Sequence, residues 1–181
     1  MVRAVAMREI LNHEQAALGL QRIAREIVER AGSGTELALV GIRRGGTPLA
    51  EKIGAEIATL TGVVVPIGSV DITLYRDDAQ LALPNPRIGR SDVPFDVSTK
   101  KVVLVDDVLF TGRTVRAALH ALLDYGRARA IELAVLVDRG GRELPIQPDY
   151  VVERVEVQPL ERVEVVIEEA GFRAVVVEAG P

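Results

Sequence analysis

Hydrophobic positions along the chain form two kinds of pattern, short continuous runs and runs with helical spacing. The continuous runs predict strands that are buried on both faces, at residues 37–42, 102–105 and 131–138. Apolar residues spaced three and four apart predict helices between and before these strands, at about 13–31, 48–61 and 115–125. Such alternation favours an α/β fold with a mainly parallel sheet flanked by helices.

Several boundaries carry their own signals. Asn12 and Gln15 resemble a capping box, so the first helix should begin there and end near Gly32 or Gly34. In the second helix, we expect Thr47 as the N-cap and Pro48 as the first helical residue. Further short strands are expected at 63–67, 70–75, 151–155, 163–167 and 175–177.

Residues 76–97 contain three prolines and many charges, and they predict a flexible loop without a packed element. Loops of this length in compact domains are usually functional. The length of 181 residues favours a single domain, 1–181.

Composition narrows the possible functions. The chain is 48% hydrophobic but 3% aromatic, so the core should be aliphatic, and the absence of cysteine excludes disulfides and thiolate chemistry. A net charge of −4 argues against a general polyanion binder, so any nucleic-acid contact needs a local basic patch. No apolar run has the length of a membrane span, and the N-terminus is too short and charged for a signal peptide. We therefore expect a cytoplasmic protein with no membrane partner.

The most informative segment is VVLVDDVLFTGRTV, residues 102–115. Asp106 and Asp107 stand where the strand should end, and the turn Thr111–Thr114 opens into a helix. Ligands of open α/β sheets bind at the carboxyl ends of strands, and a helix N-terminus offers free N–H groups to phosphate. The pattern predicts a phosphorylated sugar, held by its phosphate and its hydroxyls. The alternative is a plain connection, in which Asp and Thr are cap and turn residues.

This segment resembles the phosphoribosyl pyrophosphate (PRPP) signature of the type I phosphoribosyltransferases. Three blocks, DITLYRDD from Asp71, DDVLFTGRTVRA from Asp106 and LVDRGGRELP from Leu136, resemble in that order the PyrR family. Members of that family are pyrimidine-operon attenuators and also uracil phosphoribosyltransferases, which convert uracil and PRPP to UMP and pyrophosphate. The resemblance runs from about Arg22 to Tyr150, and it implies the phosphoribosyltransferase fold with a flexible loop and a small hood.

The resemblance also implies roles for the signature residues. Asp106 and Asp107 accept hydrogen bonds from the ribose 2′ and 3′ hydroxyls and favour an oxocarbenium-like transition state. The 5′-phosphate is bound by the residues that follow them, Val108, Leu109, Phe110, Thr111, Gly112, Arg113 and Thr114. Mg²⁺ is expected to bind with PRPP, held by ligand oxygens and water rather than by protein side chains alone.

Arg43 and Arg44 are similar to the pyrophosphate loop, although the arginine before Gly45 is shifted by one position from the family pattern. A solvated turn is the alternative. Arg76 is the third expected catalytic residue, because it could close over pyrophosphate and exclude water. The alternative there is a hairpin stem with surface charges.

Uracil should be read, partly by main-chain groups, near the end of the strand 131–138, by Val137, Asp138 and Arg139. His13 and His120 fall on helices away from this expected cleft, so no strong general base is expected.

The resemblance further implies binding of a pyrimidine-operon leader mRNA when UMP or UTP is bound. The matching positions are Arg22, Arg25, Arg139 and Arg142. Alternatively, Arg22 and Arg25 form ordinary i,i+4 pairs with Glu26 and Glu29 on a solvated helix.

Basic or histidine positions of the family are replaced here by Gly141, Gln147 and Glu153. This replacement leaves two alternatives to the bifunctional regulator: a phosphoribosyltransferase without RNA binding, and a nucleotide sensor with negligible turnover. By resemblance we also expect a homodimer or a larger homo-oligomer.

Overall fold

The computed structural model of the chain describes residues 7–31, 36–75 and 90–178. Its elements follow one another in the order β1 (Met7–Leu11), α1 (His13–Ala31), β2 (Leu37–Ile42), α2 (Gly46–Thr61), β3 (Ile67–Val70), the 3₁₀ helix η1 (Val97–Thr99), β4 (Lys101–Leu109), α4 (Arg113–Leu123), β5 (Ala130–Asp138), β6 (Tyr150–Arg154), β7 (Glu161–Glu168) and β8 (Gly171–Glu178).

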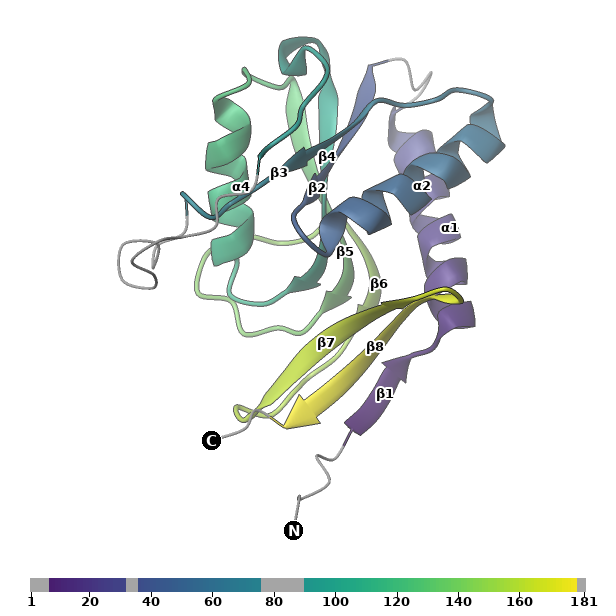
Figure 1. Cartoon of the computed structure of the whole chain (residues 1–181), viewed down its shortest axis with the longest axis vertical. Coiled ribbons are helices and arrows are strands. Elements are labelled where there is room, and N and C mark those ends of the chain that lie inside the picture. Colours follow the sequence, from purple (N-terminus) through teal and green to yellow (C-terminus); the bar gives the residue numbers. More distant parts are fainter. Residues whose placement is uncertain (1–6, 32–35, 76–89, 179–181) are drawn as a thin grey trace.

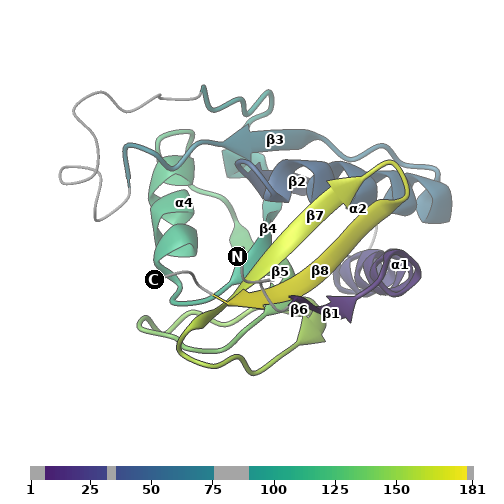
Figure 2. The ribbon, with the colours of Figure 1, turned by 60° about the horizontal axis from the view of Figure 1, so that its bottom comes forward.

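Two sheets organise these elements. Five strands form a parallel sheet in the order β3-β2-β4-β5-β6, and three form an antiparallel sheet in the order β1-β8-β7, here called the hood. Figure 1 shows α1 and α2 on one side of the parallel sheet, α4 on the other, and the hood beyond the carboxyl ends of β4 and β5. Figure 2 shows β8 in the middle of the hood, between β7 and β1. The predicted fold class is confirmed.

The parallel sheet separates two hydrophobic cores. Leu39, Val103 and Val105 belong to the core under α1 and α2, whereas Val102 and Leu104 belong to the core under α4. Successive strand residues point to opposite faces, so both faces of a central strand must be apolar. This explains why the predicted strands appear as continuous apolar runs. No helix in the described part of the chain has the length and apolarity needed to cross a membrane.

The two predicted helix starts had different outcomes. The Asn12 N–H donates to Gln15 Oε1 at 3.0 Å and the Gln15 N–H donates to Asn12 Oδ1 at 2.9 Å, which confirms the capping box. The second prediction was wrong: α2 begins at Gly46 with Gly45 as its N-cap, and no side chain caps it. Thr47 therefore lies inside the first turn, and its buried hydroxyl has no hydrogen-bond partner among the described residues.

Strand lengths also differ from the predictions. β4 does not end before the acid pair but continues to Leu109, because β5 keeps pairing with it as far as Asp138. The two strands expected at 63–67 and 70–75 reduce to β3. After β3 the chain turns, since the Asp71 carboxylate accepts a hydrogen bond from the Thr73 N–H at 2.9 Å.

The hood contains the strand that sequence patterns missed. β1 has the sequence MREIL, in which Arg8 and Glu9 interrupt the apolar pattern expected of a strand. It is recognised only by its antiparallel pairing with the apolar β8. The strands expected at 163–167 and 175–177 are the longer β7 and β8.

The loop expected at 76–97 needs a partial correction. Residues 76–89 lie outside the described residues. Of the remainder, Asp92 forms a β-bridge with Ser69, and Val97 is buried at the start of η1. Packing therefore resumes before residue 97.

We predict that Asn12→Ala lowers the free energy of unfolding by about 1 kcal/mol, because one reciprocal pair of cap hydrogen bonds is lost. For a chain of this size the melting temperature should fall by about 2–4 °C. Urea denaturation followed by circular dichroism measures the change. Glu29→Ala, an exposed position on the same helix, is the control; an equal loss in both variants would contradict the cap assignment.

Candidate active site

The site begins with a mismatch in strand length. β2 pairs with β4 only as far as Gly41 opposite Val105, whereas β5 continues to pair with β4 up to Leu109 opposite Asp138. Four residues, Asp106–Leu109, therefore extend past β2 and are called the β4 extension. One side of this extension has no strand neighbour, which leaves room for a loop and a ligand.

The loop between β2 and α2 fills part of this space with bare backbone. A Cβ on Gly46 would lie 2.0 Å from the Val105 carbonyl oxygen, and one on Gly45 would lie 2.2 Å from Asp107 Oδ2. At Gly46 the neighbouring atom is backbone, so only glycine fits there, whereas a Cβ at Gly45 would require the Asp107 carboxylate to move. The pair Gly45-Gly46 thus brings the predicted pyrophosphate loop against the predicted ribose-binding acids.

Arg43 and Arg44 precede these glycines, and both side chains are exposed. The Arg43 N–H donates to the Val70 carbonyl oxygen at 3.0 Å, and its Nε donates to Ser69 Oγ at 3.3 Å. The Arg43–Arg44 peptide bond is cis. The loop is therefore anchored on β3, while Arg44 stays exposed beside the β4 extension. Arg76 lies outside the described residues.

The two adjacent acids differ in environment. Asp106 is only 5% exposed, whereas Asp107 is half-buried. Asp106 Oδ1 accepts from the Asp107 N–H at 3.0 Å, and Asp107 Oδ1 accepts from the Val108 N–H at 2.8 Å. Burial first, and the neighbouring Asp107 charge second, raise the pKa of Asp106 well above its usual range. Asp107 is consequently the member of the pair that a ligand reaches more easily.

The turn Thr111–Thr114 leads from the β4 extension into α4. Gly112 is the N-cap and has φ +91°, which favours glycine, and it has no side chain with which to cap α4. The Arg113 N–H, the first of the helix, donates to Thr111 Oγ1 at a long 3.3 Å. Thr111 is half-buried and Thr114 is exposed, as a phosphate-binding turn requires. Leu109 differs, since its side chain is buried in the core under α4.

Residues 140–146, called the cover segment, pack over this turn. The Thr111 carbonyl oxygen accepts hydrogen bonds from the N–H groups of Glu143 at 3.0 Å and Leu144 at 3.1 Å. Arg113 Nε lies 2.6 Å from Glu143 Oε2. The cover segment therefore fixes the shape of the turn from outside.

Arg142 holds the cover segment in place. Its guanidinium donates to Asp138 Oδ1 at 2.6 Å, to the Phe110 carbonyl oxygen at 2.7 Å and to the Ile146 carbonyl oxygen at 2.8 Å. The side chain is 13% exposed. These contacts make Arg142 a cross-link between β5, the turn and the cover segment, a role that sequence analysis missed.

A second contact missed from sequence joins the ends of β4 and β5. The Arg139 guanidinium stacks on the Phe110 ring, 3.9 Å from its centroid, and burial lowers the pKa of Arg139. Gly141 makes room for the ring, since its Cβ would lie 2.5 Å from Phe110 Cε2. The pairing of Leu109 with Asp138 could have revealed this neighbour pair.

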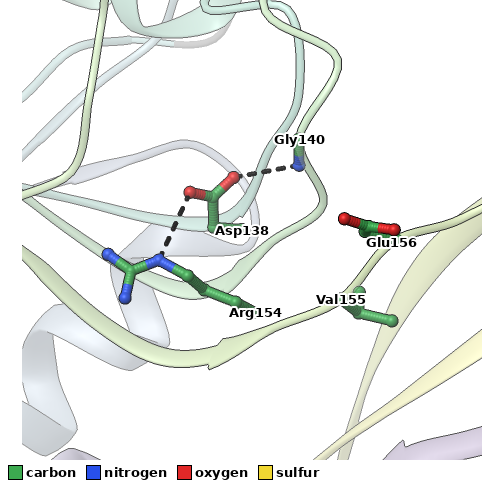
Figure 3. Close-up of a pocket in the computed structure, with 5 residues that line it drawn as sticks. All are labelled: Asp138, Gly140, Arg154, Val155 and Glu156. Carbon is green, nitrogen blue, oxygen red and sulfur yellow. Dashed lines mark hydrogen bonds and ion pairs between the residues drawn. The ribbon is translucent and has the colours of Figure 1, made fainter.

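A pocket of about 350 Å³ opens at the carboxyl ends of β5 and β6, lined by Asp138, Gly140, Arg154, Val155 and Glu156 (Figure 3). Of the three residues predicted to read uracil, only Asp138 lines it. The Val137 side chain is fully buried in the core under α1 and α2, so only its main chain can face a ligand. Arg139 turns toward Phe110.

The basic residues expected to contact RNA have different surroundings. Arg22 donates to the Val151 carbonyl oxygen at 2.7 Å and to Glu26 Oε1 at 2.8 Å, so it links α1 to β6. Arg25 is exposed on the same helix. The i,i+4 pair expected as the alternative for Arg22 is present.

Comparison with known proteins is consistent with this geometry. The model of the phosphoribosyl transferase domain matches residues 6–167. A protein named Bifunctional protein PyrR from Chloroflexus aurantiacus is 52% identical over 174 residues, 96% of each chain. The chain belongs to the PyrR family. A Picosynechococcus protein of the same name is 49% identical over 91% of this chain and 93% of that one.

Two solved structures with the same fold are more distant in sequence than these PyrR relatives. A hypoxanthine phosphoribosyltransferase of Trypanosoma cruzi has a TM-score of 0.72 and 16% identity, over 98% of this chain and 94% of that one. One from Staphylococcus aureus has a TM-score of 0.66 and 18% identity, over 86% and 80%. At this identity the likeness shows the fold alone.

We predict that Asp106→Asn raises the free energy of unfolding at neutral pH. A carboxyl whose pKa is raised on folding binds its proton more tightly in the native state, so wild-type stability falls as pH rises above the unfolded value of about 3.9. The amide has no such cost. The difference in unfolding free energy, variant minus wild type, should therefore increase from pH 4 to pH 7.

Urea titrations at four pH values measure this difference. A difference that decreases with rising pH would mean that the folded protein favours the ionised Asp106.

Proposed function

We propose that this PyrR-family protein is a uridine-nucleotide-responsive regulator that binds pyrimidine-operon leader RNA and also transfers phosphoribose from PRPP to uracil. One observation carries the enzymatic part: the β4 extension has Asp107 against the glycine-lined loop 43–46 on one side and the open N-terminus of α4 beyond its end. PRPP needs three such subsites, for pyrophosphate, ribose and 5′-phosphate.

Each subsite has a suitable group. The α4 amides and the hydroxyls of Thr111 and Thr114 bind the 5′-phosphate, because a helix N-terminus favours anions. Asp107 accepts the ribose hydroxyls, with Asp106 behind it. Arg44 contacts pyrophosphate, since its guanidinium is always charged and offers several donors.

Uracil N1 then attacks C1′, the bond from C1′ to the pyrophosphate oxygen breaks with its electron pair leaving on pyrophosphate, and the N1 proton passes to water. The negative charge near Asp107 favours the cationic sugar as that bond lengthens. The base would occupy the pocket at β5 and β6, and β4 lies between that pocket and the strand β2 that leads into the pyrophosphate loop, which supports the opposite-side approach that in-line displacement requires.

Mg²⁺ fits this arrangement as a partner of PRPP. In the part of the chain that the structure describes, no three acidic or histidine side chains gather into a metal-binding cluster. Asp107 is accessible beside the loop 43–46 and suits a hard cation held mainly by ligand oxygens and water. Bound there, Mg²⁺ would neutralise charge on the departing pyrophosphate.

For RNA, Arg25 is the strongest candidate on α1. It is exposed, and no hydrogen bond or ion pair joins it to a described residue. The Arg22 guanidinium already donates to the Val151 carbonyl oxygen on β6, so only its remaining donors are available to RNA. Arg142 acts on RNA indirectly, by fixing the cover segment.

An enzyme without RNA binding is the second candidate, and the internal contacts of Arg22 and Arg142 favour it. A leader-RNA gel shift at low salt, with and without UMP, separates the two. Binding that requires UMP supports the regulator; turnover without any shift supports the enzyme alone.

Asp107→Asn should lower kcat/KM for PRPP by about 10- to 100-fold, because a hydrogen bond to a charged group contributes about 1.5–3 kcal/mol and about 1.4 kcal/mol is tenfold. Release of pyrophosphate from PRPP and uracil measures it. An unchanged melting curve is the control for folding. A wild-type kcat/KM in the variant would show that Asp107 does not bind the ribose.

Arg25→Ala should weaken leader-RNA binding and lower the slope of log affinity against log salt by about 1, the effect of losing one phosphate contact. Uracil transfer should be unchanged. Arg129→Ala, at the opposite end of the sheet, is the matched control. Identical slopes for wild type and Arg25→Ala would show that Arg25 makes no phosphate contact with the RNA and is an ordinary solvated surface residue.

A further inference from the structure

Phe110 carries an aromatic ring that the fold covers on one face only. The Arg139 guanidinium lies over that face, 3.9 Å from the ring centroid. Gly141 meets an edge of the ring, since a Cβ there would lie 2.5 Å from Cε2 and 3.0 Å from Cδ2. Phe110 is nevertheless 43% exposed, so the opposite face of the ring is open to solvent. Because aromatic rings gain much from burial, this open face suits a flat partner that covers it.

Arg139 adds a fixed positive charge behind the ring. Its Nε is buried and has no hydrogen-bond partner among the described residues, and no ion pair joins the guanidinium to any of them. Glu161 attracts it only from beyond ion-pair distance. In contrast, Arg22, Arg113 and Arg142 all contact carboxylates. The stacked guanidinium of Arg139 is therefore held in one place and has no anion to release when a phosphate approaches.

The backbone beside the ring is exposed as well. Gly140 and Gly141 have φ of +70° and +73°, and both residues are exposed. Within the part of the chain that the structure describes, neither the Gly141 N–H nor its carbonyl oxygen forms a hydrogen bond. One donor and one acceptor thus lie at the rim of the open face, where they can meet the polar edge of a flat heterocycle.

These features together match the chemistry of an unpaired nucleobase. Single-stranded RNA is bound by aromatic faces on which its bases stack, with arginine beside them for the phosphates. An apolar protein segment fits less well, because a guanidinium and bare polar backbone border the ring instead of further apolar side chains.

We propose that Phe110 is a stacking platform for one unpaired base of the leader RNA, with Arg139 attracting a phosphate beside that base. The inference rests on the proposed function and specifies one of its RNA contacts. Phe110 directly precedes Thr111, and its carbonyl oxygen is held by Arg142 at 2.7 Å. A nucleotide phosphate bound at the turn Thr111–Thr114 therefore also fixes the platform, which gives a physical reason for RNA binding that requires UMP.

Phe110→Leu tests the inference, because leucine keeps an apolar side chain but removes the aromatic face. Affinity for the leader RNA at saturating UMP should fall about 5- to 150-fold, the equivalent of about 1–3 kcal/mol for one base stacked on an aromatic ring. Phe110→Tyr keeps the face and should stay within twofold of the wild type. A UMP titration of each variant sets the saturating concentration, so any change in nucleotide binding is measured separately.

Salt dependence separates stacking from charge. Phe110→Leu should leave the slope of log affinity against log salt unchanged, whereas Arg139→Gln should lower it by about 1. Tyr125→Leu is the matched control, because Tyr125 is 41% exposed and follows the far end of α4 from the turn. This control should bind the leader RNA as the wild type does.

Abasic substitutions in the RNA identify the stacked base. Each unpaired position of the leader is made abasic in turn, and the affinities of the wild type and Phe110→Leu are compared. One position should weaken wild-type binding by the same factor as Phe110→Leu and have no further effect in the variant, since both changes remove one contact.

The outcomes separate this inference from the proposed function. If the wild type binds the leader RNA with UMP, but Phe110→Leu binds it equally well and no abasic position couples to Phe110, the platform role is overturned while the proposed function stands. If the wild type gives no RNA complex at low salt, the RNA part of the proposed function fails and this inference fails with it. A changed sedimentation coefficient of Phe110→Leu with unchanged RNA affinity would make the open face an interface between copies of the chain, which also overturns the inference.

Discussion

The continued pairing of β4 with β5, four residues past the last pairing of β4 with β2, is the constraint on which the site depends. Had β5 ended where β2 ends, Asp106 and Asp107 would lie in a loop. Had β2 continued as far as β5, a strand would occupy the side of the β4 extension that is now open. Because only β5 continues, the backbone of the β4 extension is held firmly on one side and free on the other. A rigid strand therefore holds the acids that we propose for ribose binding, and it positions them more precisely than a loop could.

Arg142 is the second element of this design. Since β5 supports the extension, whatever fixes the end of β5 also fixes the acids and the turn after them. Arg142 does so through three acceptors on three segments, and because its side chain is only 13% exposed, competition from water is limited. Gly140 and Gly141, both with positive φ, let the chain fold back over Phe110 so that this arginine reaches its partners.

Sequence patterns predicted the parts of this structure that depend on local chemistry. The buried strands were evident because a central strand must be apolar on both faces, and the cap at Asn12 because its hydrogen bonds span three residues. What failed depends on partners distant in sequence. β1 is a strand only because β8 pairs with it, and β4 continues through two aspartates only because β5 does so. The role of Arg142 could not be derived from spacing, because its three acceptors lie on β5, on the turn after β4 and on the cover segment.

The family resemblance found the signature residues but could not separate those that face a ligand from those that support the fold. Leu109 and Val137 lie within the right segments, yet their side chains are core residues, and Arg139 stacks on Phe110. For such strand ends, alternation decides which side chain points to the ligand, and alternation fails here, because the consecutive residues Leu136 and Val137 both belong to the core under α1 and α2.

The distribution of arginine partners limits how this acidic chain can bind RNA. Arg22, Arg113, Arg142 and Arg162 are each joined to a carboxylate. A guanidinium paired in this way must exchange one anion for another when it meets a phosphate, so its net contribution is small. With a formal charge of −4 there is little long-range attraction to compensate. Under the proposed function, recognition of a leader RNA therefore has to rest on a few positioned contacts, of which Arg25 is the one proposed first, and on the shape of unpaired bases rather than on charge density.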